Sequence, residues 1–165
     1  MNENIERKLA ELGLMLPGQC TPRGNFLPYH QEGNLVFFAG QICEWNGDVP
    51  YQGPVISAGA TNLSDGPWID LDDGRKAAQI SALNLLFHLR DACGGDFNRV
   101  KSVVRLGGFV NCQAGFDQSP AVINGASDLF IELFGDNGMH ARTAVGVSGL
   151  PANASVEVDA IIALR

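Results

Sequence analysis

The sequence predicts an α+β fold in which a mixed β-sheet carries two helices packed on one face. The chain has 165 residues, of which 45% are hydrophobic, and this is enough for a single domain over residues 1–165 with its own core. Its hydrophobic periodicity changes along the chain in the order strand, strand, helix, strand, helix, strand, strand. An order of this kind is typical of a sheet with helices segregated to one side.

The N-terminal part is expected to form a short helix and a β-hairpin. Apolar residues recur at helical spacing over residues 3–13, so this segment should dock as a helix on the body. Residues 25–31 and 35–42 have strand composition on either side of a Glu-Gly-Asn turn that tolerates positive φ. These two segments should pair with each other.

Residues 47–71 are expected to be a surface excursion. The segment is rich in Gly, Pro, Asn and Ser and exceeds the length of an ordinary connection. Trp68 inside it is a candidate anchor on the body. Such long segments usually have a function or are mobile.

Two longer helices follow from their apolar stripes and end signals. The first runs from Asp72 to the glycine pair at 94–95 and begins with acidic residues. In the second, Ser119 is the expected N-cap and Pro120 the first helical residue, and Gly135 ends the helix.

Three more strands complete the sheet. They are expected at residues 100–110, 143–148 and 155–163, and the glycine pair at 107–108 suggests a bulge or bend. In the last strand the even-numbered residues from 156 to 162 should meet the helices, because alternate side chains of a strand point to opposite faces. The odd-numbered residues, which include Glu157 and Asp159, should face solvent or a neighbouring subunit.

The strand at residues 35–39 is apolar on both sides, although one face of the sheet has no helical cover. Leaving its outer side in water would forgo apolar burial of roughly 25 cal/mol per Å². The sequence therefore predicts a homo-oligomer that covers this face.

The composition indicates which partners and cofactors are not expected. The formal net charge is −7 and the pI is about 4.8, and Lys and Arg are scattered singly, so nucleic acid is not an expected partner. The cysteines form no CxxC pair and lie away from histidine clusters, which indicates reduced thiols and no metal site. The acidic N-terminus and the absence of a long apolar run predict a cytoplasmic protein with no membrane contact.

Arg142 and Glu157 are the first candidates for a functional site. If the last two strands paired around Gly149 and Leu150, Arg142 would lie opposite Glu157 on the uncovered face. Ala144 and Gly146 would share that face, and these two minimal side chains would leave room for a small ligand. The alternative is a solvated surface ion pair worth roughly 0 to 1 kcal/mol.

The histidines are weaker candidates. His88 lies within the expected long helix and is best interpreted as a packed helix residue. His30 and His140 adjoin the expected cleft and could act as acids or bases. Asp159 is interpreted as an exposed ion-pair partner, or as a neighbour that raises the pKa of Glu157.

Three segments resemble the RidA family, also called YjgF or L-PSP. They are residues 28–42, which read PYHQEGNLVFFAGQI, residues 141–145, which read ARTAV, and residues 150–161, which contain LP and VEVDAI. The similarity covers most of the chain from about residue 25. The helix at 3–13 and the insertion at 47–71 resemble the additions of a longer branch of that family.

The resemblance implies a chorismate mutase-like α+β fold of the bacillus type and a homotrimer with ligand clefts between subunits. It also implies a deaminase that hydrolyses reactive enamine or imine acids, such as 2-iminopropanoate, to a 2-keto acid and ammonia. This hydrolase chemistry needs no metal and no organic cofactor, because a protonated imine is already electrophilic.

The family's site residues carry over by position. Arg142 matches the arginine that binds the substrate carboxylate, and Glu157 matches the glutamate that activates a water. Tyr29 would line the cleft, the backbone at Gly40 would approach the ligand, and Asn124 would add a polar contact. Ala144 stands where the family commonly has a cysteine, so only a backbone contact could survive there.

Two other functions remain open. The chain could be a non-catalytic sensor in which the same arginine binds a keto acid. It could also be an endoribonuclease, as part of the family's name says, although the acidic balance argues against this activity.

Overall fold

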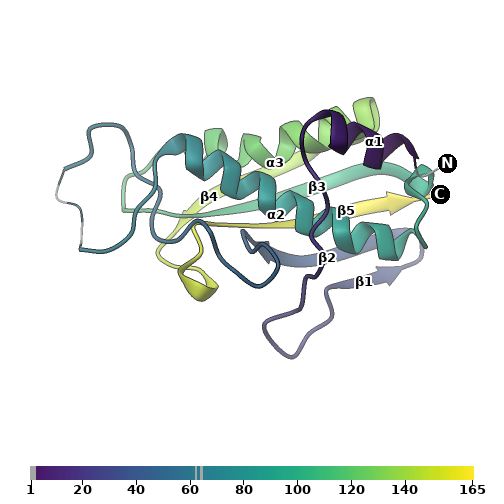
Figure 1. Cartoon of the computed structure of the whole chain (residues 1–165), viewed down its shortest axis with the longest axis horizontal. Coiled ribbons are helices and arrows are strands. Elements are labelled where there is room, and N and C mark those ends of the chain that lie inside the picture. The colour runs from purple at the N-terminus through teal and green to yellow at the C-terminus, as the bar shows by residue number, and fades with distance from the viewer. Residues whose placement is uncertain (1–2, 62, 64) are drawn as a thin grey trace.

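A five-stranded mixed sheet with helices on one face forms the body of the chain (Figure 1). The computed structural model describes residues 3–61, 63 and 65–165. The helices and strands, in chain order, are α1 (Glu3–Glu11), β1 (Tyr29–Glu32), β2 (Leu35–Ile42), α2 (Leu71–Ala92), β3 (Val100–Asn111), α3 (Ser119–Phe134), β4 (Ala141–Val147) and β5 (Val156–Leu164).

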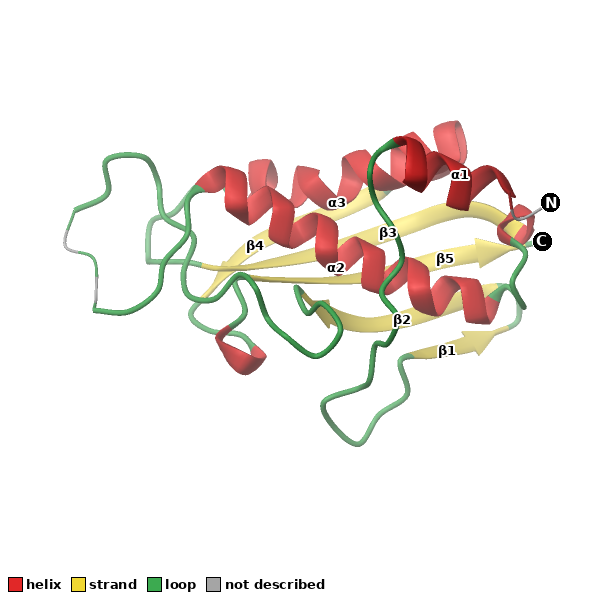
Figure 2. Ribbon diagram, viewed as in Figure 1, coloured by secondary structure: helices red, strands yellow, loops and turns green. Residues whose placement is uncertain are grey.

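The strand order is β1-β2-β5-β3-β4, in which β3 and β4 run parallel and the other neighbours antiparallel. Helices α2 and α3 lie side by side on one face of this sheet (Figure 2). The predicted α+β class, the mixed sheet and the position of both helices are thereby confirmed.

The two N-terminal elements are shorter than expected. Helix α1 ends at Glu11, two residues early, and Gly13 follows with φ of 70°. The hairpin of β1 and β2 is confirmed, with Glu32 opposite Leu35 and Gly33 at φ of 59°. Strand β1 begins at Tyr29 and not at residue 25.

The helix ends differ slightly from the expected residues. Helix α2 begins at Leu71, because the Asp70 side chain caps it by accepting the backbone N–H of Asp73 at 2.9 Å. Helix α3 is preceded by Gln118, so the expectation that Ser119 is the N-cap was wrong by one residue. Gly135 ends α3 as predicted, with φ of 59°.

The glycine pair in β3 makes no bulge, contrary to the expectation. The irregularities of β3 lie nearer its start, between residues 100 and 105, and Gly107 and Gly108 continue the regular ladder. A Cβ at Gly107 would come within 2.9 Å of the Asp159 carboxyl carbon, and one at Gly108 within 2.5 Å of Ile123. The absence of side chains at these two glycines therefore lets Asp159 pack closely on one face of the sheet and Ile123 on the other.

The largest correction concerns the last two strands. Strands β4 and β5 do not form a hairpin, because β3 lies between them and pairs with both. Arg142 is paired with the buried Leu106, on the helix side of the sheet. Glu157 is paired with Phe109, on the other side. The predicted cross-strand pair of Arg142 and Glu157 is therefore wrong.

The two faces of the sheet differ in burial, as the alternation of residues in β5 predicted. Val156, Val158, Ala160 and Ile162 are buried against the helices, whereas Glu157, Asp159 and Ile161 are only half-buried. Apolar side chains are left in water on the open face, since Phe37 is 42% exposed and Val145 41%. This exposure favours an interface with another subunit.

The segment at 47–71 is partly packed into the body, although residues 62 and 64 lie outside the described part. Val55 is fully buried and bridges to Ile69 and to Cys112. Of the described residues, 57–61 and 65–67 belong to the part that projects beyond the sheet (Figure 1). Trp68 is 49% exposed and so is not a buried anchor.

Candidate functional site

Arg142 lies at the start of the edge strand β4 and reaches along α3. Its Nη1 donates to Asn124 Oδ1 at 2.8 Å and to Ser127 Oγ at 2.9 Å, and its Nη2 donates to the carbonyl oxygen of Pro120 at 3.1 Å. These three acceptors are three or four residues apart along α3, so they lie on one face of the helix. The face holds the guanidinium against the edge of the domain.

The Arg142 charge has no carboxylate partner within the described part of the chain. All three acceptors are neutral, and no ion pair involves this arginine. A guanidinium has five N–H donors, and the Nε–H and one Nη2–H find no protein partner among the described residues. Two donors on neighbouring nitrogens suit a carboxylate or phosphate.

Ser127 and His140 extend the contacts of Arg142. Ser127 is 6% exposed, and its Oγ lies 2.9 Å from His140 Nε2. His140 Nδ1 lies 2.6 Å from the carbonyl oxygen of Gly138. Sequence reasoning missed Ser127, although its position seven residues after Pro120 and three after Asn124 is a usable signal.

The neighbours of Arg142 in β4 leave less space than their size suggested. Gly146 shares its face, but a Cβ there would lie 2.5 Å from the Cys112 Sγ, so this space is filled. Ala144 is half-buried and packs against the core. Any ligand on Arg142 would approach from the α3 side of the sheet edge.

Glu157 occupies a separate place on the open face. Its carboxylate lies directly over the backbone of Gly40, where a Cβ would come within 2.8 Å of the carboxyl carbon. The expected approach of Gly40 to a ligand is thus an approach to Glu157 in this chain. A cavity of about 190 Å³ adjoins both residues and is closed by the segment from Cys20 to Phe26.

The surroundings of Glu157 shift the pKa of its carboxyl group. Burial, and then the negative charge of Asp159, raise the pKa of the Glu157 carboxyl above its ordinary value. Asp159 in turn pairs with Arg105 at 3.1 Å. A carboxylate with a raised pKa is suited to accept a proton near neutral pH.

Tyr29 lies apart from both places. It is on β1, the opposite edge strand from β4, and its hydroxyl donates to Asp91 at 2.7 Å. This hydrogen bond, with burial, raises the pKa of Tyr29 to about 12. Arg142, Glu157 and Tyr29 therefore do not form one cleft within a single chain.

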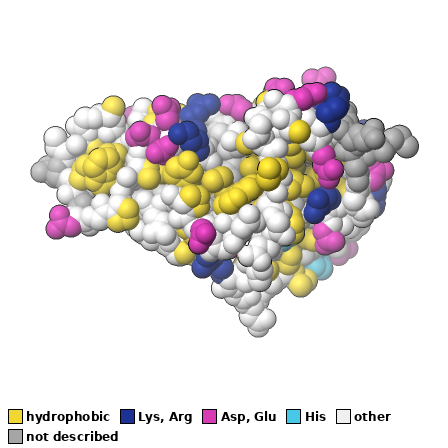
Figure 3. All heavy atoms as spheres, viewed as in Figure 1, with side chains coloured by type: hydrophobic (Ala, Val, Ile, Leu, Met, Phe, Trp, Pro, Cys, Tyr) yellow, Lys and Arg dark blue, Asp and Glu magenta, His cyan; other side chains and the backbone are white. Residues whose placement is uncertain are grey.

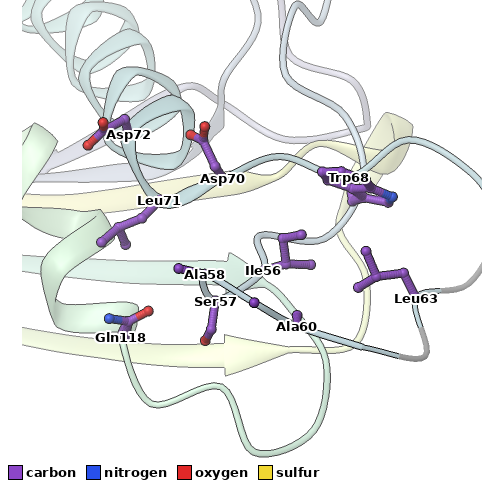
Figure 4. Close-up of a pocket in the computed structure, with 11 residues that line it drawn as sticks. Ile56, Ser57, Ala58, Ala60, Leu63, Trp68, Asp70, Leu71, Asp72 and Gln118 are labelled. Atoms are coloured by element: carbon purple, nitrogen blue, oxygen red, sulfur yellow. The ribbon is translucent and has the colours of Figure 1, made fainter.

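A further cavity of about 540 Å³ lies between the insertion and the starts of two helices (Figure 4). Trp68 and Leu63 line its outer side, and Asp70, Asp72 and Gln118 come from the ends of α2 and α3. Gln118 stands two residues before Pro120, which binds Arg142. Arg142 is not among the described residues that line this cavity.

Several chemistries find no support in the described residues. They contain no group of three or more His, Cys, Asp or Glu that could hold a metal ion. On the face shown in Figure 3, Lys and Arg are interspersed with Asp and Glu, and no basic stripe is visible. None of the helices that the structure describes is long and apolar enough to span a membrane. The four cysteines are free thiols, and burial raises the pKa of Cys20 and Cys93 to about 11.

Comparison with known proteins places this geometry in context. Residues 6–163 match the family described as "YjgF/chorismate mutase-like, putative endoribonuclease". Protein TCP17 of Trypanosoma cruzi is 37% identical over 162 residues, which are 98% of this chain and 94% of that protein.

Two solved structures illustrate the range of similarity. The protein Atu1372 from Agrobacterium tumefaciens, described as of unknown function, superposes with a TM-score of 0.85 at 35% identity, over 99% of this chain and 94% of the other. RidA from an Antarctic Psychrobacter has a TM-score of 0.55 at 21% identity, over 90% and 94%. At that identity the likeness to RidA shows the fold alone.

Proposed function

The chain belongs to the YjgF/chorismate mutase-like family, and on this premise we propose that it hydrolyses reactive enamine or imine acids to 2-keto acids and ammonia. The substrate class is a small carboxylate such as 2-iminopropanoate. Arg142 binds the substrate carboxylate, and Glu157 activates the attacking water.

The observation that carries the proposal is the unpaired charge of Arg142. Helix α3 fixes the guanidinium with neutral oxygens and leaves two N–H donors without a protein partner among the described residues. Arginine and a carboxylate frequently form a bidentate pair through two parallel N–H···O bonds. A carboxylate from a ligand supplies the missing charge and both hydrogen bonds.

The chemistry needs only positioning and one proton acceptor. Water adds to the carbon of the protonated imine while Glu157 takes a proton from the water, which forms a neutral carbinolamine. Glu157 then gives that proton to the carbinolamine nitrogen, and the C–N bond breaks so that ammonia leaves. The hydroxyl proton passes to the leaving ammonia, and the carbon keeps the oxygen as a ketone. The raised pKa of Glu157 suits it to accept and return the proton.

The proposal requires more than one subunit, because Arg142 and Glu157 lie on opposite faces of one sheet. In a homotrimer the β4 edge of one subunit lies beside the open face of the next, and Arg142 of one subunit meets Glu157 of the partner subunit in a cleft. Tyr29 and Asn124 line that cleft, and the Ala144 backbone borders it. The exposed Phe37 and Val145 on the open face support this packing.

The test is the release of 2-keto acid and ammonia from an imine made in place by an amino-acid oxidase, with the oxidase in excess. Arg142→Ala should lower kcat/KM by at least about 100-fold, because it removes two charge-assisted hydrogen bonds worth about 1.5–3 kcal/mol each. Arg75→Ala is the matched control, since Arg75 forms an exposed pair with Asp128. Equal activity of both variants would contradict the proposal.

A sensor role is the second candidate, and Ala144 favours it, because the family commonly has a cysteine at this position. Saturable binding of 2-ketobutyrate to wild type without any turnover would establish this role.

An endoribonuclease activity is disfavoured by the net charge of −7. RNA cleavage that survives repeated purification would restore it. The free thiols fit a cytoplasmic location.

A further inference from the structure

Arg142 is linked through Ser127 to His140, a histidine that has no part in the proposed reaction. Ser127 Oγ accepts from Arg142 Nη1 at 2.9 Å and lies 2.9 Å from His140 Nε2. The serine is almost fully buried, and His140 is half-buried. The three side chains come from α3, from β4 and from the residue just before β4.

The chemistry of the end groups assigns a direction to this chain of hydrogen bonds. The carbonyl oxygen of Gly138 can only accept, so the proton of His140 is on Nδ1, 2.6 Å away. In the neutral ring Nε2 then accepts the hydroxyl hydrogen of Ser127. The lone pairs of Ser127 Oγ are left to face Arg142 Nη1.

The Nδ1–H tautomer also leaves Ser127 Oγ free to accept from Arg142. If Nε2 donated instead, Ser127 Oγ would receive two donors, and its own hydrogen would need a new acceptor. With the proton on Nδ1, each donor meets an acceptor.

We propose that His140 and Ser127 are positioning residues, which orient the Arg142 guanidinium so that its two remaining N–H donors face the ligand carboxylate. Asn124 and the Pro120 carbonyl anchor the other contacts, and Ser127 with His140 behind it fixes the rotation of the guanidinium. The ligand part of this inference rests on the proposed function. The orientation of Arg142 does not.

The orientation can be tested without any ligand by ¹⁵N NMR of the full chain. The His140 ring should show the Nδ1–H tautomer, and the Arg142 Nη signals should report slow rotation. His140→Phe and Ser127→Ala should speed that rotation at least about 3-fold. His140→Gln, which keeps an acceptor near the Nε2 position, and Ser127→Thr should restore it. His30→Gln, at an exposed histidine on β1, is the control.

Binding of 2-ketobutyrate gives the second readout. The Kd should rise about 3- to 10-fold in His140→Phe and stay within 2-fold of wild type in His140→Gln, with unchanged unfolding temperatures. The inference would be overturned if His140 showed the Nε2–H tautomer. It would also be overturned if His140→Phe left the rotation rate of the Arg142 guanidinium unchanged. If the wild type binds no keto acid while the NMR results hold, the proposed function fails and the positioning of Arg142 stands.

Discussion

Gly40 offers the sharpest test of the role given to Glu157. A Cβ at position 40 would lie 2.8 Å from the Glu157 carboxyl carbon and 3.1 Å from its Cγ. Carbon atoms prefer to be about 3.5–4.0 Å apart, so Gly40→Ala should displace the carboxylate by about 1 Å. A shift of this size in a reacting group costs about 100-fold in rate. We expect kcat/KM to fall by about that factor.

The fold should tolerate this substitution. Gly40 is not among the glycines with positive φ, so alanine can adopt its backbone conformation. Only the far end of a flexible side chain has to move, and the loss of a glycine restricts the unfolded chain by about 0.4–1 kcal/mol. The unfolding temperature should therefore change little while activity is lost.

The assay is the oxidase-coupled release of 2-keto acid, measured with thermal unfolding on the same samples. Gly149→Ala is the matched control, because a Cβ at Gly149 meets nothing within 4 Å and its φ is not positive. Activity of Gly40→Ala within 2-fold of wild type would refute the argument that the position of Glu157 limits the reaction. A large drop in unfolding temperature would refute the claim that only Glu157 moves.

Three other substitutions have distinct expected outcomes. Asp159→Asn removes a negative charge that raises the pKa of Glu157. The acid limb of the pH–rate profile should therefore move to lower pH. A shift to higher pH would contradict this expectation. Glu157→Gln should flatten the pH dependence of stability, measured by urea unfolding. The raised pKa lets the folded state hold more protons than the unfolded state, so wild-type stability falls as pH rises from the unfolded to the folded pKa. Gly125→Ala should destabilise the fold by about 1–3 kcal/mol, because its Cβ would lie 2.8 Å from the carbonyl carbon of Arg75; an unchanged unfolding temperature would rule this out.

The local elements were readable from the sequence because their signals are local. The apolar stripe and acidic start of α2, the glycine that ends α3 and the alternation along β5 each depend on neighbouring residues. Periodicity also placed Val156 and Ile162 under the helices correctly. Helix starts were less accurate, because Asp70 and Gln118 lie one or two residues from equally good candidates.

The site was harder to predict because strand neighbours are a non-local property. The parity argument for Arg142 and Glu157 assumed that consecutive strands pair, and the insertion of β3 between them placed the two residues on opposite faces. Asn124, which the family resemblance assigns to the ligand, lies in contact with Arg142, and its contact with a ligand stays a prediction. Ser127 was missed, although it lies three residues after Asn124 and therefore on the same face of α3 as the other acceptors of Arg142.

The most direct test of the central claim is a crystal structure of the protein soaked with 2-ketobutyrate. We expect the ligand carboxylate to lie about 3 Å from Nε and Nη2 of Arg142, with the bonds to Asn124, Ser127 and Pro120 retained. A keto acid bound elsewhere, with those two donors facing only water, would contradict the role of Arg142 as the carboxylate-binding residue.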